Sequence, residues 1–324
     1  MDKKKIILFL FVLMIVAFVM SIALGAINFS FKAVFSSLFS SEATDERLIV
    51  VGLRLPRAIT GALVGMALAV SGALLQGIMR NHLASPSVIG VTNGASFVGH
   101  LVLIAFPTLA HLLPIGSIFG ALATTLFIYV VAYQDGVNPN QMILSGVAIS
   151  AVFTAFNNLI KSVYSDRIVN IVGFLVGSLN GTSWATVKLI APYILVGLFL
   201  ALLMSYKMNI LLLGDDVSSS LGLRVENFRF LMIVVSSLLS GAAISAAGLI
   251  SFVGLIVPHI ARLIVGSDYR YLTITSALMG ASFVMLADTI GRVVLPIGEL
   301  SVSIVIAIFG APFFLYLLRK SYRS

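Results

Sequence analysis

Cysteine is absent from this chain of 324 residues, and charged side chains are scarce, at 10% of the total. Without cysteine the chain can form neither a disulfide framework nor a thiolate metal site. A soluble domain carries about 25% charged residues. This chain is 60% hydrophobic, with a mean hydropathy of +1.12, and a soluble fold could not bury that much apolar surface. Most of the chain is therefore expected to lie in lipid.

The apolar runs also lack any alternation of apolar and polar residues. A transmembrane β-barrel needs strands with that period-two pattern. The runs here are continuous over about 20 residues, which is the length of a helix that crosses a bilayer. Because lipid cannot satisfy backbone hydrogen bonds, helices are the remaining solution. The sequence predicts an all-α integral membrane protein.

The chain divides into about ten apolar segments of membrane-spanning length. The expected spans are 6–27, 56–79, 88–106, 115–133, 142–163, 186–206, 230–249, 250–266, 272–291 and 300–318. The division between the seventh and eighth spans is placed near Gly248, and the eighth is short. No long hydrophilic stretch interrupts the series, so residues 1–324 are expected to form one transmembrane domain.

The distribution of basic residues predicts the orientation. With the N-terminus inside, the inside segments hold 12 of the 20 Lys and Arg and the outside segments hold 8. This excess of positive charge favours cytoplasmic termini. Lys3, Lys4 and Lys5 precede an apolar run that is longer than the core of a signal peptide, so we expect an uncleaved first span. The formal charge of +8 is read as this topology signal and not as nucleic-acid binding.

Catalytic and ion-coupling patterns are missing as well. There is no Walker-type phosphate loop, so ATP hydrolysis would need a separate subunit. Asp288 is a rare charge inside a span, and it lies four residues before Arg292, where the two can pair on one helix face. An ion-driven carrier needs buried ionisable residues, which are scarce here. A membrane-embedded enzyme needs such residues clustered at one depth, and the sequence has no such cluster, so it disfavours both classes. The four histidines have no metal-ligand spacing and are His82, His100, His111 and His259.

Small residues recur at a spacing of four in the second span, at Gly61, Gly65 and Ala69. This spacing lets helices pack closely. Spans two to five and seven to ten start on opposite sides of the membrane. An inverted repeat of these two sets, common in transporters, is a further expectation.

Arg54 and Arg57 flank Leu55-Pro56 at the outer mouth of the second span. Three residues apart, both can present on one helix face. Contact with lipid headgroups is one interpretation. Docking of an acidic partner through guanidinium–carboxylate pairs is the other.

Several motifs in a fixed order then resemble the permease family of ABC importers for ferric siderophores, haem and cobalamin. The resemblance extends over about residues 47–318. The motifs are Arg54-Leu55-Pro56-Arg57, Ser71-Gly72-Ala73-Leu74-Leu75-Gln76, Arg80-Asn81-His82-Leu83-Ala84, Gly90-Val91-Thr92-Asn93-Gly94-Ala95, Phe252-Val253-Gly254-Leu255-Ile256-Val257-Pro258-His259 and Gly310-Ala311-Pro312-Phe313.

The resemblance implies a fold of ten helices, like that of a cobalamin-importer permease. It also implies partners, namely a second permease (another copy or a related chain), two ATPase subunits that hold ATP and Mg, and an extracytoplasmic substrate-binding protein. No cofactor, metal or catalytic residue is implied in this chain. Arg54, Arg57 and Arg292 match family arginines that pair with glutamates of the binding protein.

Two segments match the cytoplasmic gate of the family, which narrows the exit. One is Asn81, His82 and Leu83, and the other is Leu144, Ser145 and Gly146. Family members usually carry Asn-Pro-Leu-Ala followed by an acidic residue and Pro. In this chain His82 replaces the first Pro, and Ser85 replaces the acid.

Segment 208–229 matches the coupling helices that sit in a cleft of the ATPase. The contact candidates are Asp215, Asp216, Leu221, Gly222, Leu223 and Arg224. The resemblance thus predicts the permease of an ATP-driven importer in the bacterial cytoplasmic membrane. A ferric siderophore is the first expectation for its cargo and haem the next. A cobalamin importer permease, or an ion-coupled secondary transporter, is the alternative. No residue decides the cargo, or whether the permease pairs with itself or with a related chain.

Overall fold

The computed structural model describes residues 2–321, apart from 26, 40–43, 88, 134–138 and 296. The described part of the chain is helical and has no β-strand. Ten of its helices coincide with the ten expected spans. They are α1 (Lys3–Ala23), α4 (Leu55–Ile78), α5 (Val91–His100), α6 (Leu113–Ala132), α7 (Pro139–Val163), α9 (Trp184–Leu203), α12 (Val225–Ala247), α13 (Val253–Val265), α14 (Tyr269–Val293) and α15 (Val302–Ser321).

Among the described residues, seven helices are long and apolar enough to cross a membrane. Three more apolar helices are shorter, at Val91–Ala105, Val253–Val265 and Val302–Leu315. The first of these joins α5 to a π-helical turn, η2 (Leu101–Ala105). The expected break near Gly248 is confirmed, since α12 ends at Ala247 and α13 begins at Val253. The number of ten membrane crossings stays a prediction, because three of the helices fall short of spanning length.

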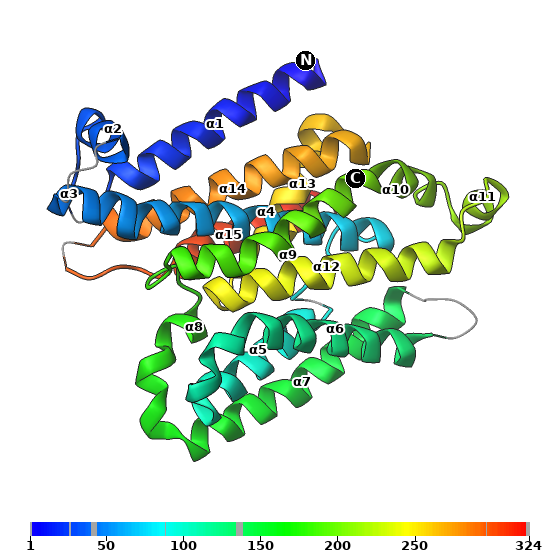
Figure 1. Ribbon diagram of the computed structural model, residues 1–324. Coiled ribbons are helices and arrows are strands. Elements are labelled where there is room, and N and C mark those ends of the chain that lie inside the picture. Colours follow the sequence, from blue (N-terminus) through cyan, green and yellow to red (C-terminus); the bar gives the residue numbers. More distant parts are fainter. Residues whose placement is uncertain are drawn as a thin grey trace.

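Short helices cap the two ends of the bundle. At one end lie α2 (Phe31–Phe39), α3 (Asp45–Arg47) and η1 (Leu48–Arg54), and at the opposite end lie α10 (Ser205–Leu211) and α11 (Asp215–Ser220). The remaining short elements are η3 (Pro107–Leu112), η4 (Ser165–Ile171) and α8 (Val172–Val176). We call the first end the arginine end and the second the α11 end (Figure 1). The labels of both chain termini lie toward the α11 end in Figure 1.

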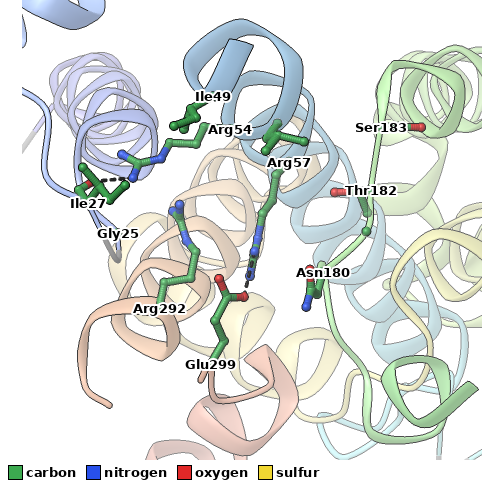
Figure 2. Close-up of a pocket in the computed structure, with 12 residues that line it drawn as sticks. Gly25, Ile27, Ile49, Arg54, Arg57, Asn180, Thr182, Ser183, Arg292 and Glu299 are labelled. Atoms are coloured by element: carbon green, nitrogen blue, oxygen red, sulfur yellow. Dashed lines mark hydrogen bonds and ion pairs between the residues drawn. The ribbon is translucent and has the colours of Figure 1, made fainter. Parts of the chain in front are cut away.

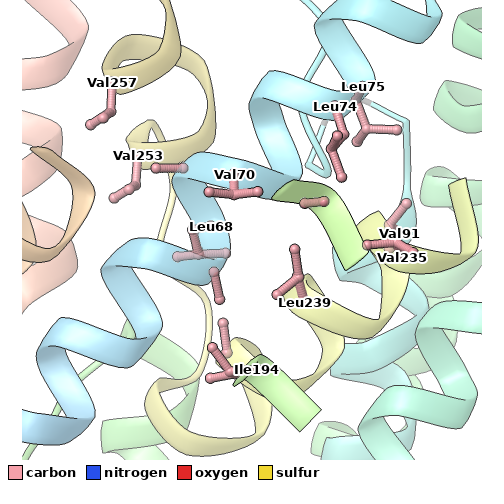
Figure 3. Close-up of a cluster of buried hydrophobic side chains, with 14 of the residues drawn as sticks. Leu68, Val70, Leu74, Leu75, Val91, Ile194, Val235, Leu239, Val253 and Val257 are labelled. Atoms are coloured by element: carbon pink, nitrogen blue, oxygen red, sulfur yellow. The ribbon is translucent and has the colours of Figure 1, made fainter. Parts of the chain in front are cut away.

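Helix α4 forms the centre of the bundle. It packs against α14, α12, α13 and α9, and most of its residues are buried. Leu68 and Val70 of α4 meet Leu239 of α12 in the core that Figure 3 shows. Helix α1 lies along α14 on one side, while α5, α6 and α7 form the other side (Figure 1). Helix α7 is the least covered of the seven long helices, because only 11% of its most apolar stretch is buried.

The small residues of α4 permit the close packing that their spacing predicts. A Cβ atom on Gly65 would overlap the backbone of Gly280 in α14, and one on Gly72 would overlap Gly254 in α13. A hydrogen bond between serine hydroxyls joins α4 to α12, where Ser71 and Ser236 lie 2.7 Å apart. In the absence of a hydrophobic force between helices in lipid, such close contacts and hydrogen bonds hold a bundle together.

The same helix pairings occur in both halves of the chain. Helix α4 packs on α14 as α12 packs on α6, and α13 packs on α4 as α5 packs on α12. The pairs α5–α6 and α13–α14 correspond in the same way. The short helices α5 and α13 also both follow a residue in left-handed conformation, Gly90 (φ 83°) and Phe252 (φ 66°). These correspondences support the expected inverted repeat of spans two to five and seven to ten.

Candidate functional site

Arg57 is the centre of the charged cluster at the arginine end. It lies in the first turn of α4, directly after Pro56. Its Nη2 lies 2.8 Å from Asp288 Oδ1, and its Nε lies 3.0 Å from Asp288 Oδ2. Its Nη1 lies 2.9 Å from Glu299 Oε2. Arg57 therefore binds two carboxylates at once, and its forked guanidinium suits that role.

Asp288 is shared between two arginines. The pair between Asp288 and Arg292 that their spacing predicts is confirmed, with Arg292 Nε 3.1 Å from Asp288 Oδ2. Both side chains are buried, at 3% and 4% exposure. Arg292 also donates to the backbone oxygen of Ser21 at 2.7 Å, which joins α14 to the end of α1. Buried charges persist only when they are paired and hydrogen-bonded, as these are.

Arg54 is bound differently, by backbone oxygens at the C-terminal end of α1. Its Nη1 donates to Ile22 at 2.8 Å and to Ala23 at 2.9 Å, and its Nη2 donates to Ile27. The last carbonyls of a helix have no partner within it, and a cation near them also complements the helix dipole. The guanidinium lies 4.8 Å from the ring centre of Phe29. Arg54 thus anchors the end of α1 and is only 8% exposed.

The three arginines surround one pocket of about 440 Å³. Figure 2 shows Arg54, Arg57 and Arg292 reaching its floor from η1, α4 and α14, with Glu299 beside them. Its other lining residues are Gly25, Ile27, Ile49, Leu53, Asn180, Gly181, Thr182 and Ser183. The cluster of three arginines, Asp288 and Glu299 has a formal charge of +1, so the pocket suits a further anionic group.

The structure brings together all three arginines that the sequence singled out. It also shows that Arg54 and Arg292 are largely covered and already hydrogen-bonded within the chain. Docking through them stays a prediction. Glu299, a partner of Arg57, was not among the predicted site residues. Its only signal in the sequence is its position shortly after Arg292, in a chain with 12 acidic residues.

At the α11 end, the predicted gate segment follows directly on α4. Asn81 Oδ1 accepts from the N–H of Leu83 at 2.9 Å, which closes a tight turn. His82 Nδ1 lies 2.7 Å from Arg262 Nη1, and that same Nη1 donates to Gln76 Oε1 at 3.1 Å. Because Arg262 can only donate, His82 must present an unprotonated Nδ1. Burial, then the positive charges of Arg262 and His259, lower the pKa of His82 and favour this state.

The second predicted gate segment lies near the start of α7. Leu144 is 70% exposed, whereas Gly146 is buried against the backbone of Ile89. A Cβ atom on Gly146 would lie 2.7 Å from the Ile89 oxygen. The loop that begins at Asn81 therefore runs on to touch the segment of Leu144, Ser145 and Gly146. A gate role for either segment stays a prediction.

The predicted coupling residues lie on α11 and the turn that follows it. Asp215 and Asp216 form the first turn of α11, and Gly222 has the positive φ (83°) that the turn before α12 requires. Leu221 is 59% exposed and Arg224 is exposed, while Leu223 is half-buried. Helix α11 projects from the bundle in Figure 1. Asp215, however, makes ion pairs within the chain, with Arg80 and Arg229.

Among the described residues, no three His, Asp or Glu side chains lie close enough to hold a metal ion. The charged groups instead gather at the two ends of an apolar bundle. These features define a multi-pass helical membrane protein.

Comparison with known proteins then gives the family. The model of the FecCD transport family matches residues 13–320. The chain therefore belongs to this family, and the resemblance drawn from its motifs is confirmed.

Named relatives and a solved structure agree with this assignment. The chain is 36% identical to the Fe(3+)-citrate import system permease protein YfmE of Bacillus subtilis over 98% of this chain and 96% of that one. It is 40% identical to the cobalamin import system permease protein BtuC of Halobacterium salinarum over 84% of this chain and 74% of that one. A metal-chelate type ABC transporter solved in an inward-facing conformation matches with a TM-score of 0.87 and 29% identity, over 98% and 99% of the two chains.

Proposed function

We propose that this chain is the membrane-spanning permease of an ATP-driven importer that translocates an iron complex. The observation that carries the proposal is similarity over nearly the whole chain to permeases named for iron citrate and iron hydroxamate. The absence of a phosphate loop from the sequence fits a permease that relies on a separate ATPase. The whole chain would form one transmembrane permease domain in the bacterial cytoplasmic membrane, with both termini cytoplasmic.

The arginine end would face outward and receive the extracytoplasmic binding protein. A pocket floored by Arg54, Arg57 and Arg292 offers guanidinium groups to a partner's carboxylate. Arg57 is the most accessible of the three, with a side chain that is 12% exposed. Its partner Glu299 is 34% exposed and can move away. Charge complementarity of this kind speeds capture and makes docking sensitive to salt.

The α11 end would face the cytoplasm and receive the ATPase. Val217 in α11 and Leu221 directly after it are exposed apolar residues, which is what a helix inserted into a partner's cleft presents. Asp216 and Arg224 would add polar contacts at its rim. ATP and Mg would be held by the two ATPase subunits, so this chain itself has no catalytic residue, metal or cofactor in the proposal.

A second permease, either another copy or a related chain, would complete the translocation path. The uncovered face of α7 supports this, since exposed side chains such as Val152 and Phe156 follow one another along it. Lipid would cover the rest of the bundle. Cargo would pass between the permeases as the gate segments at Asn81–Leu83 and Leu144–Gly146 open and close.

The cargo class proposed first is a ferric siderophore, with haem second. The cobalamin permease among the relatives keeps cobalamin as the alternative. An ion-coupled secondary transporter would need buried ionisable groups along the path. The described spans hold few such groups, and Asp288 is already paired with two arginines.

The test is uptake into vesicles that contain this chain and its ATPase, with the binding protein outside. The binding protein is loaded in turn with ⁵⁵Fe-labelled ferric siderophore, haem or cobalamin. Uptake of one cargo that requires both ATP and the binding protein is the expected result. Uptake that persists with a catalytically inactive ATPase, or that follows an imposed ion gradient, would contradict the proposal.

A further inference from the structure

The side chain of Arg80 connects α4 to the projecting helix α11. Arg80 is the second residue after α4, and its Nη2 donates to the Asp215 carboxylate. The same nitrogen donates to the backbone oxygen of Leu211, the last residue of α10, at 3.1 Å. One guanidinium therefore holds the end of α10 and the start of α11 together.

Asp215 is held from a second side by a buried arginine of α12. Arg229 Nη2 lies 3.0 Å from Asp215 Oδ2, and the Arg229 side chain is only 4% exposed. Arg229 also pairs with Glu226 one turn earlier on α12. Burial alone raises the pKa of Asp215, but the hydrogen bonds and charges of Arg229 and Arg80 outweigh it and hold the pKa below its usual value. The Asp215 carboxylate is thus a bridge between α4 and α12.

The backbone at Arg80 leads from the end of α4 directly into the gate segment Asn81–Leu83. Arg80 has a positive φ of 45°, which non-glycine residues seldom adopt. This conformation turns the chain out of α4, and the N–H of Asn81 then bonds to the Gln76 oxygen at 3.1 Å. The gate segment Asn81–Leu83 begins at the next residue. A displacement of Asp215 that keeps its contact with Arg80 therefore acts on the residue directly before that segment.

Helices α10 and α11 are also fastened to each other. The hydroxyl of Ser218 in α11 donates to the Ile210 oxygen of α10 at 2.8 Å. A force on α11 is thus passed to α10, and Arg80 contacts both. By contrast, the side chain of Asp216 makes no ion pair or hydrogen bond within the described part of the chain, and it remains free to face a partner.

We propose that Arg80 and Asp215 are positioning residues that transmit the movement of α11 to the gate segment Asn81–Leu83. The inference rests on the proposed coupling of α11 to an ATPase. It assigns Asp215 a role inside the permease, and leaves Asp216, Leu221 and Arg224 as the candidates for ATPase contact. Binding of the ATPase should accordingly survive loss of the Asp215 charge. The movement of the gate segment in response to nucleotide should not survive it.

The test follows the gate directly in the complete complex of permease and ATPase in nanodiscs. Because the chain has no native cysteine, a single Leu83→Cys substitution gives it one reporter thiol, at a position that is 43% exposed, and labelling is read on the permease band after the subunits are separated. The rate of its reaction with a fluorescent maleimide is measured without nucleotide and with ATP plus vanadate. ATP hydrolysis and co-purification of the ATPase are measured on the same samples.

In the parent background, ATP plus vanadate is expected to change the labelling rate. Arg80→Gln should reduce that change by about fivefold, which corresponds to the upper range for an exposed ion pair. Asp215→Asn also removes a partner of the buried Arg229 and should reduce the change at least as much. ATPase co-purification should be retained and ATP hydrolysis should stay within about twofold. Arg80→Lys keeps the charge and should keep most of the response. The matched control is Arg270→Gln, which breaks another exposed arginine–carboxylate pair, with Asp268, that does not touch α11.

A full labelling response in Arg80→Gln would overturn the proposal. So would loss of ATPase co-purification in Asp215→Asn, because that residue would then be an ATPase contact. A parent complex that binds no ATPase, or that shows no response to nucleotide, would instead overturn the proposed function on which the inference rests.

Discussion

Arg57 Nη1 lies 2.9 Å from Glu299 Oε2 in the lining of the pocket that the three arginines surround. The side chain that is proposed to receive a partner's carboxylate thus already pairs with this carboxylate of its own chain, in addition to the buried Asp288. Glu299 is partly exposed, at 34%, while Arg57 is 12% exposed. A docking carboxylate must therefore either displace Glu299 or share Arg57 with it.

Glu299→Gln is expected to strengthen docking of the binding protein, since it removes the competing charge from Arg57. We expect the affinity to rise by about fivefold at low salt, with a smaller gain at high salt because exposed charges are screened. The measurement is surface plasmon resonance of the binding protein on nanodiscs. Glu46→Gln removes an equal charge from the first turn of α3, at the same end, and controls for long-range repulsion. Weaker docking in Glu299→Gln would mean that Glu299 orients Arg57 for the partner.

Asp288→Asn is expected to destabilise the fold strongly. It leaves two arginines, Arg57 and Arg292, without their shared carboxylate in a buried setting. Breaking a buried pair costs about 3–5 kcal/mol. By comparison Glu299→Gln, which breaks a partly exposed pair, should cost about 1 kcal/mol or less. Thermal unfolding of both variants in detergent checks this order, and equal shifts in Tm would refute it.

Gly65→Ala is expected to push α4 and α14 apart. Its new Cβ atom would overlap backbone atoms of Gly280, which cannot rotate out of the way. Overpacking of this kind costs about 1–3 kcal/mol, so Tm should fall. Gly52→Ala is the control, because a Cβ atom there meets nothing within 4 Å. That substitution should leave Tm unchanged or raise it slightly, since alanine favours a helix over glycine.

The contact between His82 and Arg262 is expected to weaken in acid. The bond at 2.7 Å needs neutral His82, and burial and nearby positive charge lower the pKa of His82 from its ordinary value of 6.5. Because the pKa of His82 is lower in the folded protein, the contact has its full strength above pH 6.5. The contact is lost as the pH falls from 6.5 through the lowered pKa of His82.

A spin label at Leu83→Cys should therefore become more mobile as the pH at the α11 end falls below about 6.5. Substitution of His82→Gln should abolish the change, because an amide does not titrate in this range. His111→Gln, in η3, should preserve it. Persistence of the pH effect in His82→Gln would point to His259, whose ring lies 6.2 Å from that of His82.

Much of the fold was predictable from local properties of the sequence. A continuous apolar run of about 20 residues has one solution in lipid, and the predicted spans coincide with helices for that reason. Even the break near Gly248 was predictable, and the structure gives that glycine a φ of 68°. The pair Asp288–Arg292 was visible because residues four apart lie on one helix face.

The charged ends were predictable only in part. The motifs selected Arg54, Arg57 and Arg292, and the structure places them round one pocket. They did not reveal that Arg54 binds the last carbonyls of α1, because backbone acceptors leave no signature in a sequence. Nor did they reveal that Asp215 faces Arg80 and Arg229 within the chain.

By itself, then, the sequence determined the membrane class, the helices and the family, since hydrophobic length and motif order are properties of the linear chain. Only the tertiary structure decided which charges meet. Arg57 pairs with Glu299, and Arg80 with Asp215, across long stretches of sequence. Such pairs exist because close packing of α4 against α14 and α12 brings distant helix ends within hydrogen-bonding distance. No spacing in the sequence encodes that distance.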